Sequence, residues 1–235
     1  MLVVNSLLKQ MKKGLFLTLM VFMFVSIVSF SSNNFQTPET IHKAIHIERT
    51  LGNLKATIRV DSSRQRSIKK ILNIINQYNP QLPAKQKTKI ASEIYKMSIK
   101  YNNLDVDLIC ATITHESALT WRPDIQSWAG ALGLMQIMPT TGMFLCELEG
   151  IKWTDAEDVL YNPISNIRLG CRYLSMLIES YQLVGGLAAY NGGEKRVALW
   201  LARGRDNTVL YKETRGYIPA VLRFYEIFKT ESNSS

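Results

Sequence analysis

Apolar residues recur with helical rather than alternating spacing from about residue 67 to residue 228. The first two such stretches are separated by Asn79 and Pro80, because proline cannot continue a helix. Their inner faces are marked by Ile68, Ile71, Leu72 and Ile75 in the first stretch and by Ile90, Ile94 and Met97, after Pro83, in the second. These patterns predict two consecutive helices that each bury one face.

The next predicted helix begins at Asp105, a residue type that favours the N-cap position, and reaches Glu116. Ile109 and Ile113 lie on one face of it, and Glu116 occupies the following position of the same apolar stripe. Burial disfavours a charged carboxylate, so the pKa of Glu116 should rise and the group could act as a general acid near neutral pH. The alternative is that Glu116 turns outward into water at the helix end.

An apolar segment punctuated by glycines follows, from residue 130 to residue 138, with Gln136 as its single amide. It leads into a helix that begins at Pro139. A helix ending in an acid, followed by a close-packed loop that bears one amide, is typical of the wall of a cleft.

The remaining chain predicts four more helical segments. A long amphipathic helix begins after Asn162, an N-cap followed by proline, and should break at Gly185-Gly186. A short helix over residues 187–190 and another that closes at Gly204 come next. The last helix is expected over residues 216–228, with Pro219 in its first turn.

The N-terminal part differs in character. Lysines at positions 9, 12 and 13 precede an uncharged apolar run over residues 15–30, which is typical of an export signal. We therefore expect residues 1–31 to be a cleaved signal peptide or an N-terminal membrane anchor. Residues 32–66 are expected to be a spacer, with a short helix near residues 41–51 and a brief strand over residues 54–60. A helical domain should occupy residues 67–235.

The formal charge of +9 indicates anionic surroundings, such as nucleic acid, a membrane surface or the cell-wall polymer. The export signal and the lack of a basic–aromatic motif argue against nucleic acid. Three cysteines permit one Cys146–Cys171 disulfide or three free buried thiols, with Cys110 buried in either case. His115 precedes Glu116, but the metalloprotease pattern needs a second histidine where Leu119 stands. We expect no metal and no cofactor.

Four short motifs follow one another in order: Glu116-Ser117, Gly133-Leu134-Met135-Gln136, Ala189-Tyr190-Asn191-Gly192-Gly193 and Glu213-Thr214-Arg215-Gly216-Tyr217. With these motifs, residues 105–228 resemble the soluble-type lytic transglycosylases. The resemblance implies an all-α, goose-type lysozyme-like fold with an active-site cleft that binds peptidoglycan glycan strands.

It also implies a mechanism. Glu116 would protonate the oxygen of the β-1,4 bond between N-acetylmuramic acid and N-acetylglucosamine, and would then accept the proton of the C6 hydroxyl. The product would be a 1,6-anhydro-muramoyl end. A single acid suffices if the substrate acetamide assists. No second carboxylate among Asp124, Glu147, Glu149 and Glu213 is an obvious nucleophile.

The resemblance assigns substrate-side roles to seven further residues. Ser117 would contact the sugar or hold the end of the acid's helix, Tyr190 would orient Glu116 by a hydrogen bond, and Asn191 would support the cleft. The others are cleft-lining or substrate-contacting residues: Met135, Gln136, Glu213 and Tyr217. For Met135, plain core packing is the alternative.

Two other functions stay open at this point. A goose-type lysozyme would add water instead and would need another carboxylate, and a catalytically silent wall-binding protein would keep the fold alone. The expected partner is peptidoglycan in the cell envelope, with a monomeric protein tethered through residues 15–30 if the signal is retained.

Overall fold

The structure, a computed structural model, describes residues 38–231, and in that range the regular elements are helices. The predicted signal or anchor, with its apolar run over residues 15–30, lies outside the described residues. Among the residues that are described, no helix is both long and apolar enough to cross a membrane.

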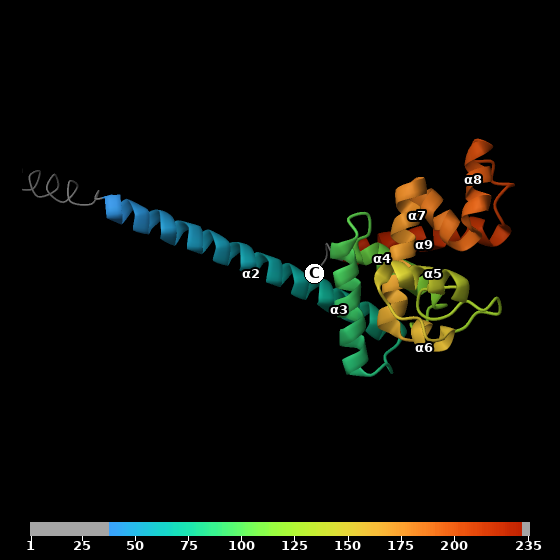
Figure 1. The fold of residues 1–235 in the computed structure, drawn as a ribbon, viewed down its shortest axis with the longest axis horizontal. Coiled ribbons are helices and arrows are strands. Elements are labelled where there is room, and N and C mark those ends of the chain that lie inside the picture. Colours follow the sequence, from blue (N-terminus) through green and yellow to red (C-terminus); the bar gives the residue numbers. More distant parts are fainter. Residues whose placement is uncertain (1–37, 232–235) are drawn as a thin grey trace, which may run out of the picture. The chain divides into compact units, whose positions relative to one another are not determined.

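Eight helices are present in this range, and Figure 1 labels them. They are α2 (Pro38–Tyr78), α3 (Ala84–Lys100), α4 (Val106–Glu116), α5 (Pro139–Glu149), α6 (Ala156–Leu160), α7 (Pro163–Gly192), α8 (Glu194–Ala202) and α9 (Lys212–Glu231). The chain divides into a unit over residues 1–61 and a compact unit over residues 62–235. The predicted all-α class is confirmed.

The core of the second unit surrounds α4. Every residue of α4 from Leu108 to Thr114 is buried, and α4 packs against α3 and α9. Helix α7 packs against α3, α5, α6, α8 and α9 and so connects the two sides of the unit. The fully buried side chains include Ile71, Ile75, Ile90, Ile94, Ile109, Ile113, Leu134, Leu174, Val221 and Phe228. The apolar stripes predicted for the first three helices therefore face this core.

Two helix starts follow the predicted capping chemistry. The Asp105 carboxylate accepts a hydrogen bond from the Leu108 N–H at 2.8 Å, as an N-cap should. Asn162 accepts from Ile164 and Ser165 at the start of α7, with Pro163 as the first helical residue. The cysteines Cys110, Cys146 and Cys171 are all buried and free, so the disulfide alternative is not formed.

The prediction of a strand over residues 54–60 is wrong, because α2 is continuous through these positions. The helix begins at Pro38 rather than near residue 67. The side chains from His46 to Asp61 are exposed. A helix stretch that buries no face in its own domain lacks the broad apolar face of a globular helix, so only its part near residues 41–51 was predicted to be helical.

Two predictions about the later helices are also wrong. Gly185 and Gly186 are helical and buried, and α7 instead bends at Gln182, where φ is 61°. Gly186 is needed because a Cβ there would lie 2.8 Å from the main chain of Ile178. Helix α9 begins at Lys212, so Pro219 lies inside it rather than in its first turn.

Candidate active site

Glu116 is the last residue of α4, and the chain turns sharply behind it. Ala118, Leu119 and Trp121 all have positive φ values, of 50°, 64° and 49°. Such conformations cost about 1–2 kcal/mol per non-glycine residue. The turn thus requires strong tertiary contacts to hold it.

Trp121 supplies those contacts. Its side chain is fully buried, its indole Nε1 donates to Thr114 Oγ1 at 3.0 Å, and its main-chain N–H donates to Ser117 Oγ at 3.1 Å. Ser117 is itself completely buried. Of the two roles expected for Ser117, the geometry fits the one that holds the helix end, and the predicted sugar contact does not fit a side chain without exposed surface.

The Glu116 carboxyl group lies in dense surroundings although the residue keeps some exposed surface. Burial raises the pKa of Glu116 to about 7, the Tyr217 hydroxyl beside it lowers that pKa, and the negative charge of Glu213 raises it. A carboxylic acid with this pKa is half protonated near neutral pH, as a group that both gives and accepts a proton should be.

The two tyrosines of the motifs have roles other than those predicted. Tyr217 is buried, and its hydroxyl lies close enough to the Glu116 carboxyl to affect the pKa of that group. Among the described residues, this hydroxyl has no hydrogen-bond partner at good geometry. The Tyr190 hydroxyl donates to the main-chain oxygen of Met135 at 2.8 Å. The predicted hydrogen bond from Tyr190 to Glu116 is therefore corrected to a loop contact, and Tyr217 is the tyrosine at the acid.

The loop after Gly133 is held by Asn166, a fully buried residue of α7. Its amide nitrogen donates to the Leu132 and Leu160 carbonyls at 2.9 Å each, and its Oδ1 accepts from the Met135 N–H at 2.7 Å. Gly133 has φ of 79°, and a Cβ there would lie 2.2 Å from the Leu160 oxygen. Glycine is consequently required at the start of this motif.

The Met135 side chain belongs to the core and not to the cleft surface. It is fully buried, with its sulfur 3.9 Å from Cys171 Sγ and so close to Gly170 that a Cβ there would lie 2.4 Å from it. The predicted substrate contact of Met135 is corrected to core packing, because no part of the side chain reaches solvent. Its peptide group holds the loop instead.

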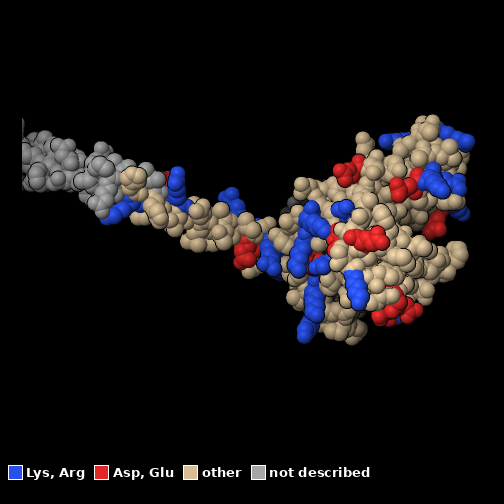
Figure 2. Space-filling model, viewed as in Figure 1, with Lys and Arg blue, Asp and Glu red and all other residues tan. Residues whose placement is uncertain are grey.

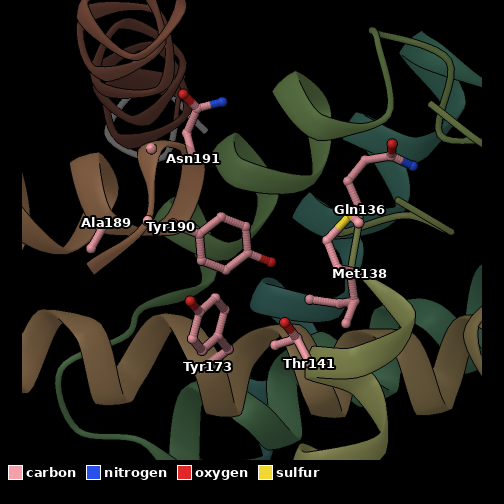
Figure 3. A pocket seen from close by; sticks show the side chains of 10 residues that line it. Gln136, Met138, Thr141, Tyr173, Ala189, Tyr190 and Asn191 are labelled. Carbon is pink, nitrogen blue, oxygen red and sulfur yellow. The ribbon is translucent and has the colours of Figure 1, made fainter. Parts of the chain in front are cut away.

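Gln136 lines a pocket of about 310 Å³. Its backbone has φ of 46°, and its side-chain nitrogen donates to the Gly133 oxygen at 2.8 Å. The pocket walls come from α5, α7 and the loop between α4 and α5, with the lining residues Gln136, Ile137, Met138, Thr141, Tyr173, Ala189, Tyr190, Asn191, Gly192 and Gly193. Figure 3 shows the Tyr190 ring in this pocket, with its hydroxyl pointing toward the segment of Gln136 and Met138.

Asn191 and the start of α9 form the next part of the site. The Thr214 hydroxyl donates to Asn191 Oδ1 at 2.7 Å, and the Asn191 amide nitrogen is 3.5 Å from Glu213 Oε1. A Cβ on Gly192 would lie 2.7 Å from Thr214 Oγ1, so the glycine allows the close approach of α7 and α9. Asn191 thus supports the cleft wall, while Glu213 is exposed at its edge.

Two of the other candidate carboxylates, Asp124 and Glu149, are engaged elsewhere. Asp124 is exposed and forms an ion pair with Arg122 at 3.0 Å. Glu149 accepts from Lys100 and from the Tyr101 hydroxyl. His115 packs edge-on against the Tyr217 ring at 4.7 Å, and burial lowers its pKa. Within residues 38–231, no cluster of His, Cys, Asp and Glu could hold a metal ion.

Comparison with known proteins decides the family. The model of the transglycosylase SLT domain matches residues 93–209. These residues form a domain of this family. The match contains Glu116, Gln136 and Tyr190 and stops short of Glu213 and Tyr217, although the fold brings Tyr217 to the acid.

Three relatives illustrate the similarity of this SLT protein. The soluble lytic murein transglycosylase of Escherichia coli K12 is 32% identical over 143 residues, which is 57% of this chain and 22% of the relative. Membrane-bound lytic murein transglycosylase C of Histophilus somni strain 2336 is 31% identical over 44% of this chain and 31% of the relative. A solved structure of lytic transglycosylase Slt from Pseudomonas aeruginosa, an inactive mutant with glutamine in place of one glutamate, has a TM-score of 0.54.

That solved structure is 31% identical to the SLT protein and is matched over 60% of this chain and 24% of its own length. In each of these three comparisons, the match covers less than a third of the relative. The similarity therefore concerns the helical domain.

Two residues that hold the SLT site were missed by sequence reasoning. Asn166 stands within the amphipathic stripe of α7, where an amide beside apolar positions signals a buried hydrogen-bonding role. Trp121 follows the acid by five residues, and a large aromatic directly after a helix end is a signal for an anchored turn.

Proposed function

We propose that this protein is a peptidoglycan lytic transglycosylase. The observation that carries the proposal is the Glu116 carboxyl group, placed at the end of a buried helix with a pKa of about 7. The SLT domain and the names of the relatives, which are lytic murein transglycosylases, support the same assignment. One of these relatives, the Slt enzyme, is described as inactive when a glutamate is changed to glutamine.

In the proposed reaction, protonated Glu116 gives its proton to the oxygen between N-acetylmuramic acid and N-acetylglucosamine, and the C1–O bond breaks. The substrate acetamide stabilises the positive charge at C1. The Glu116 carboxylate then takes the proton of the C6 hydroxyl, and the C6 oxygen bonds to C1. The result is a 1,6-anhydro ring, and Glu116 is protonated again.

The surrounding residues prepare Glu116 for both steps. Burial favours the protonated acid, while the Tyr217 hydroxyl favours the carboxylate, and the balance leaves both forms accessible near pH 7. Gln136, Tyr190 and Asn191 line the adjoining pocket with polar groups suited to an acetamide or a sugar hydroxyl.

The test is digestion of purified peptidoglycan followed by mass spectrometry of the released muropeptides. We expect products lighter by one water than hydrolysed ends. Glu116→Gln should reduce the rate by at least about a hundredfold, whereas Glu147→Gln, at an exposed position of α5, should keep it. Wild-type protein that binds sacculi without releasing products would contradict the proposal and favour the silent wall-binding protein.

Hydrolysis is the second candidate, and one observation favours it. Glu213 is exposed and acts electrostatically on Glu116, so it is the carboxylate best placed to activate a water molecule. Reducing-end products that disappear with Glu213→Gln would establish this lysozyme activity instead.

We further propose that the protein works in the cell envelope, where its polymer substrate lies. The apolar run over residues 15–30 and its preceding lysines support export, with retention as a membrane anchor as one form. Fractionation of cells and the N-terminal sequence of the mature protein would distinguish a cleaved signal from an anchor. Recovery in the cytosol with an intact N-terminus would contradict both.

A further inference from the structure

An apolar stripe runs along the exposed part of α2. Ile47, Leu51, Leu54 and Ile58 are between 49% and 59% exposed. They follow one another in steps of four, three and four residues, which is the spacing of the a and d positions of a heptad. Large aliphatic side chains with this spacing form a seam on one side of the helix.

We propose that this stripe is the interface with a second copy of the chain, in a two-stranded coiled coil. This replaces the expectation of a monomer. The four side chains lie within a narrow angular range, and a strict a/d seam of this kind fits a partner helix rather than the broader face that packs on a domain. The stripe is self-complementary, since its layers contain only leucine and isoleucine.

The charges next to the seam suit this partner. Glu48 lies at the edge of the stripe, where it meets Lys43 of the second copy if the helices run parallel and Lys55 if they run antiparallel. In either direction an acid faces a base at both edges of the dimer. Such pairs select the partner and add modestly to its affinity.

A membrane surface fits less well. An interfacial helix has a wide apolar face with aromatic residues and gathers its basic residues near the lipid headgroups. On the face that Figure 2 shows, the Lys and Arg side chains of the outer part of α2 are spaced singly rather than collected in one patch. The stretch from Ile47 to Ile58 contains no aromatic residue.

The sequence also limits the length of the seam. Asp61 and Gln65 occupy the next two positions of the same spacing, so the apolar layers end after Ile58. Two heptads make a short coiled coil, and an exposed helix of this length is marginal in water without a partner. We therefore expect helix formation and dimerisation to be coupled in this stretch.

Sedimentation velocity of the full chain in detergent, over a range of concentrations, tests the proposal. Leu54→Glu should raise the dissociation constant of the dimer by at least about tenfold, because two carboxylates would face each other in the seam. Ala56→Glu adds the same charge on the opposite face of the exposed helix and should leave it unchanged. At Gly52 a Cβ would meet no atom within 4 Å. Gly52→Ala should therefore lower the dissociation constant of the dimer, because alanine favours the helix more than glycine does.

Crosslinking gives an independent measurement. The three native cysteines are buried, so they should not react with a short bis-maleimide. Leu51→Cys lies in the seam and should form covalent dimers with this reagent. Ala56→Cys lies on the opposite face of the helix and should not. A monomer at all concentrations, or a dimer that Leu54→Glu leaves intact, would overturn the proposal. Binding of the monomer to anionic vesicles that is lost with Leu54→Glu would assign the stripe to a membrane instead.

Discussion

The hydroxyl of Tyr190 donates a hydrogen bond to the main-chain oxygen of Met135 at 2.8 Å. This contact joins α7 to the loop that bears Gln136, while the Tyr217 hydroxyl interacts with the carboxyl of Glu116. One tyrosine therefore positions a cleft wall, and the other adjusts the acidity of the proposed catalytic group.

The two tyrosines should respond differently to loss of the hydroxyl. Tyr217→Phe removes the group that lowers the pKa of Glu116, so the pH at which activity falls should move upward. Tyr190→Phe leaves the Met135 carbonyl without its partner and should lower the free energy of unfolding by about 1–3 kcal/mol, with little movement of the pH profile. Activity from pH 5 to 9 and urea unfolding measure the two effects. The opposite pattern would restore the predicted bond between Tyr190 and Glu116.

The pH dependence of the reaction should show the raised pKa of Glu116. The first step needs the protonated acid, so kcat/KM on soluble glycan chains should decline as the pH rises through about 7. Glu213→Gln removes a negative charge that raises this pKa and should move the decline to lower pH. Glu157→Gln, at an exposed position of α6, is the control. If kcat/KM declined at the same pH in Glu213→Gln as in the wild type, Glu213 would not affect the pKa of Glu116.

Glu116→Gln should stabilise the protein at alkaline pH. The pKa of Glu116 is raised on folding from 4.5 to about 7, so the folded state binds the proton more tightly. Its contribution to stability is complete below pH 4.5 and is lost as the pH rises through 7. At pH 8 the wild type should therefore be less stable than Glu116→Gln by up to about 3 kcal/mol. Equal unfolding free energies of the two proteins at pH 8 would contradict this burial cost.

Asn166 should be among the most sensitive positions outside the proposed chemistry. Asn166→Ala leaves the buried Met135 N–H without its partner and removes the amide donor to the Leu132 and Leu160 carbonyls, and should cost about 3 kcal/mol or more. The N-cap change Asn162→Ala, four residues earlier in the same helix, should cost only about 1 kcal/mol. Thermal unfolding measures both, and similar losses would show that Asn166 acts as an ordinary helix residue.

The sequence predicted those elements whose apolar residues face the core. The stripe ending at Glu116, the caps at Asp105 and Asn162 and the helix start at Pro139 all match the structure. Before residue 67, only a short part of α2 near residues 41–51 was predicted, because the side chains between His46 and Asp61 contact no core. A broad apolar face with helical spacing indicates that a helix packs on its own domain. The exposed part of α2 has only a narrow apolar stripe, so this criterion did not identify it.

The site was predicted at the level of motifs but not of contacts. The raised pKa of Glu116 follows from its place on an apolar stripe. The partners of Tyr190, Ser117 and Met135 depend on how the loop folds onto α7, which motif order does not specify. Gly185 looked like a helix break because glycine is flexible, whereas the actual bend lies at Gln182, a residue type without that signal.

The bend at Gln182 divides α7 into two parts, and each part forms a hydrogen bond with the main chain of Met135. Asn166, before the bend, accepts from the Met135 N–H, and Tyr190, after it, donates to the Met135 carbonyl. The main-chain angles at one exposed position thus set how far apart the two anchors lie. A change of this bend would therefore shift one anchor of the Met135 loop relative to the other, while every motif residue stays the same.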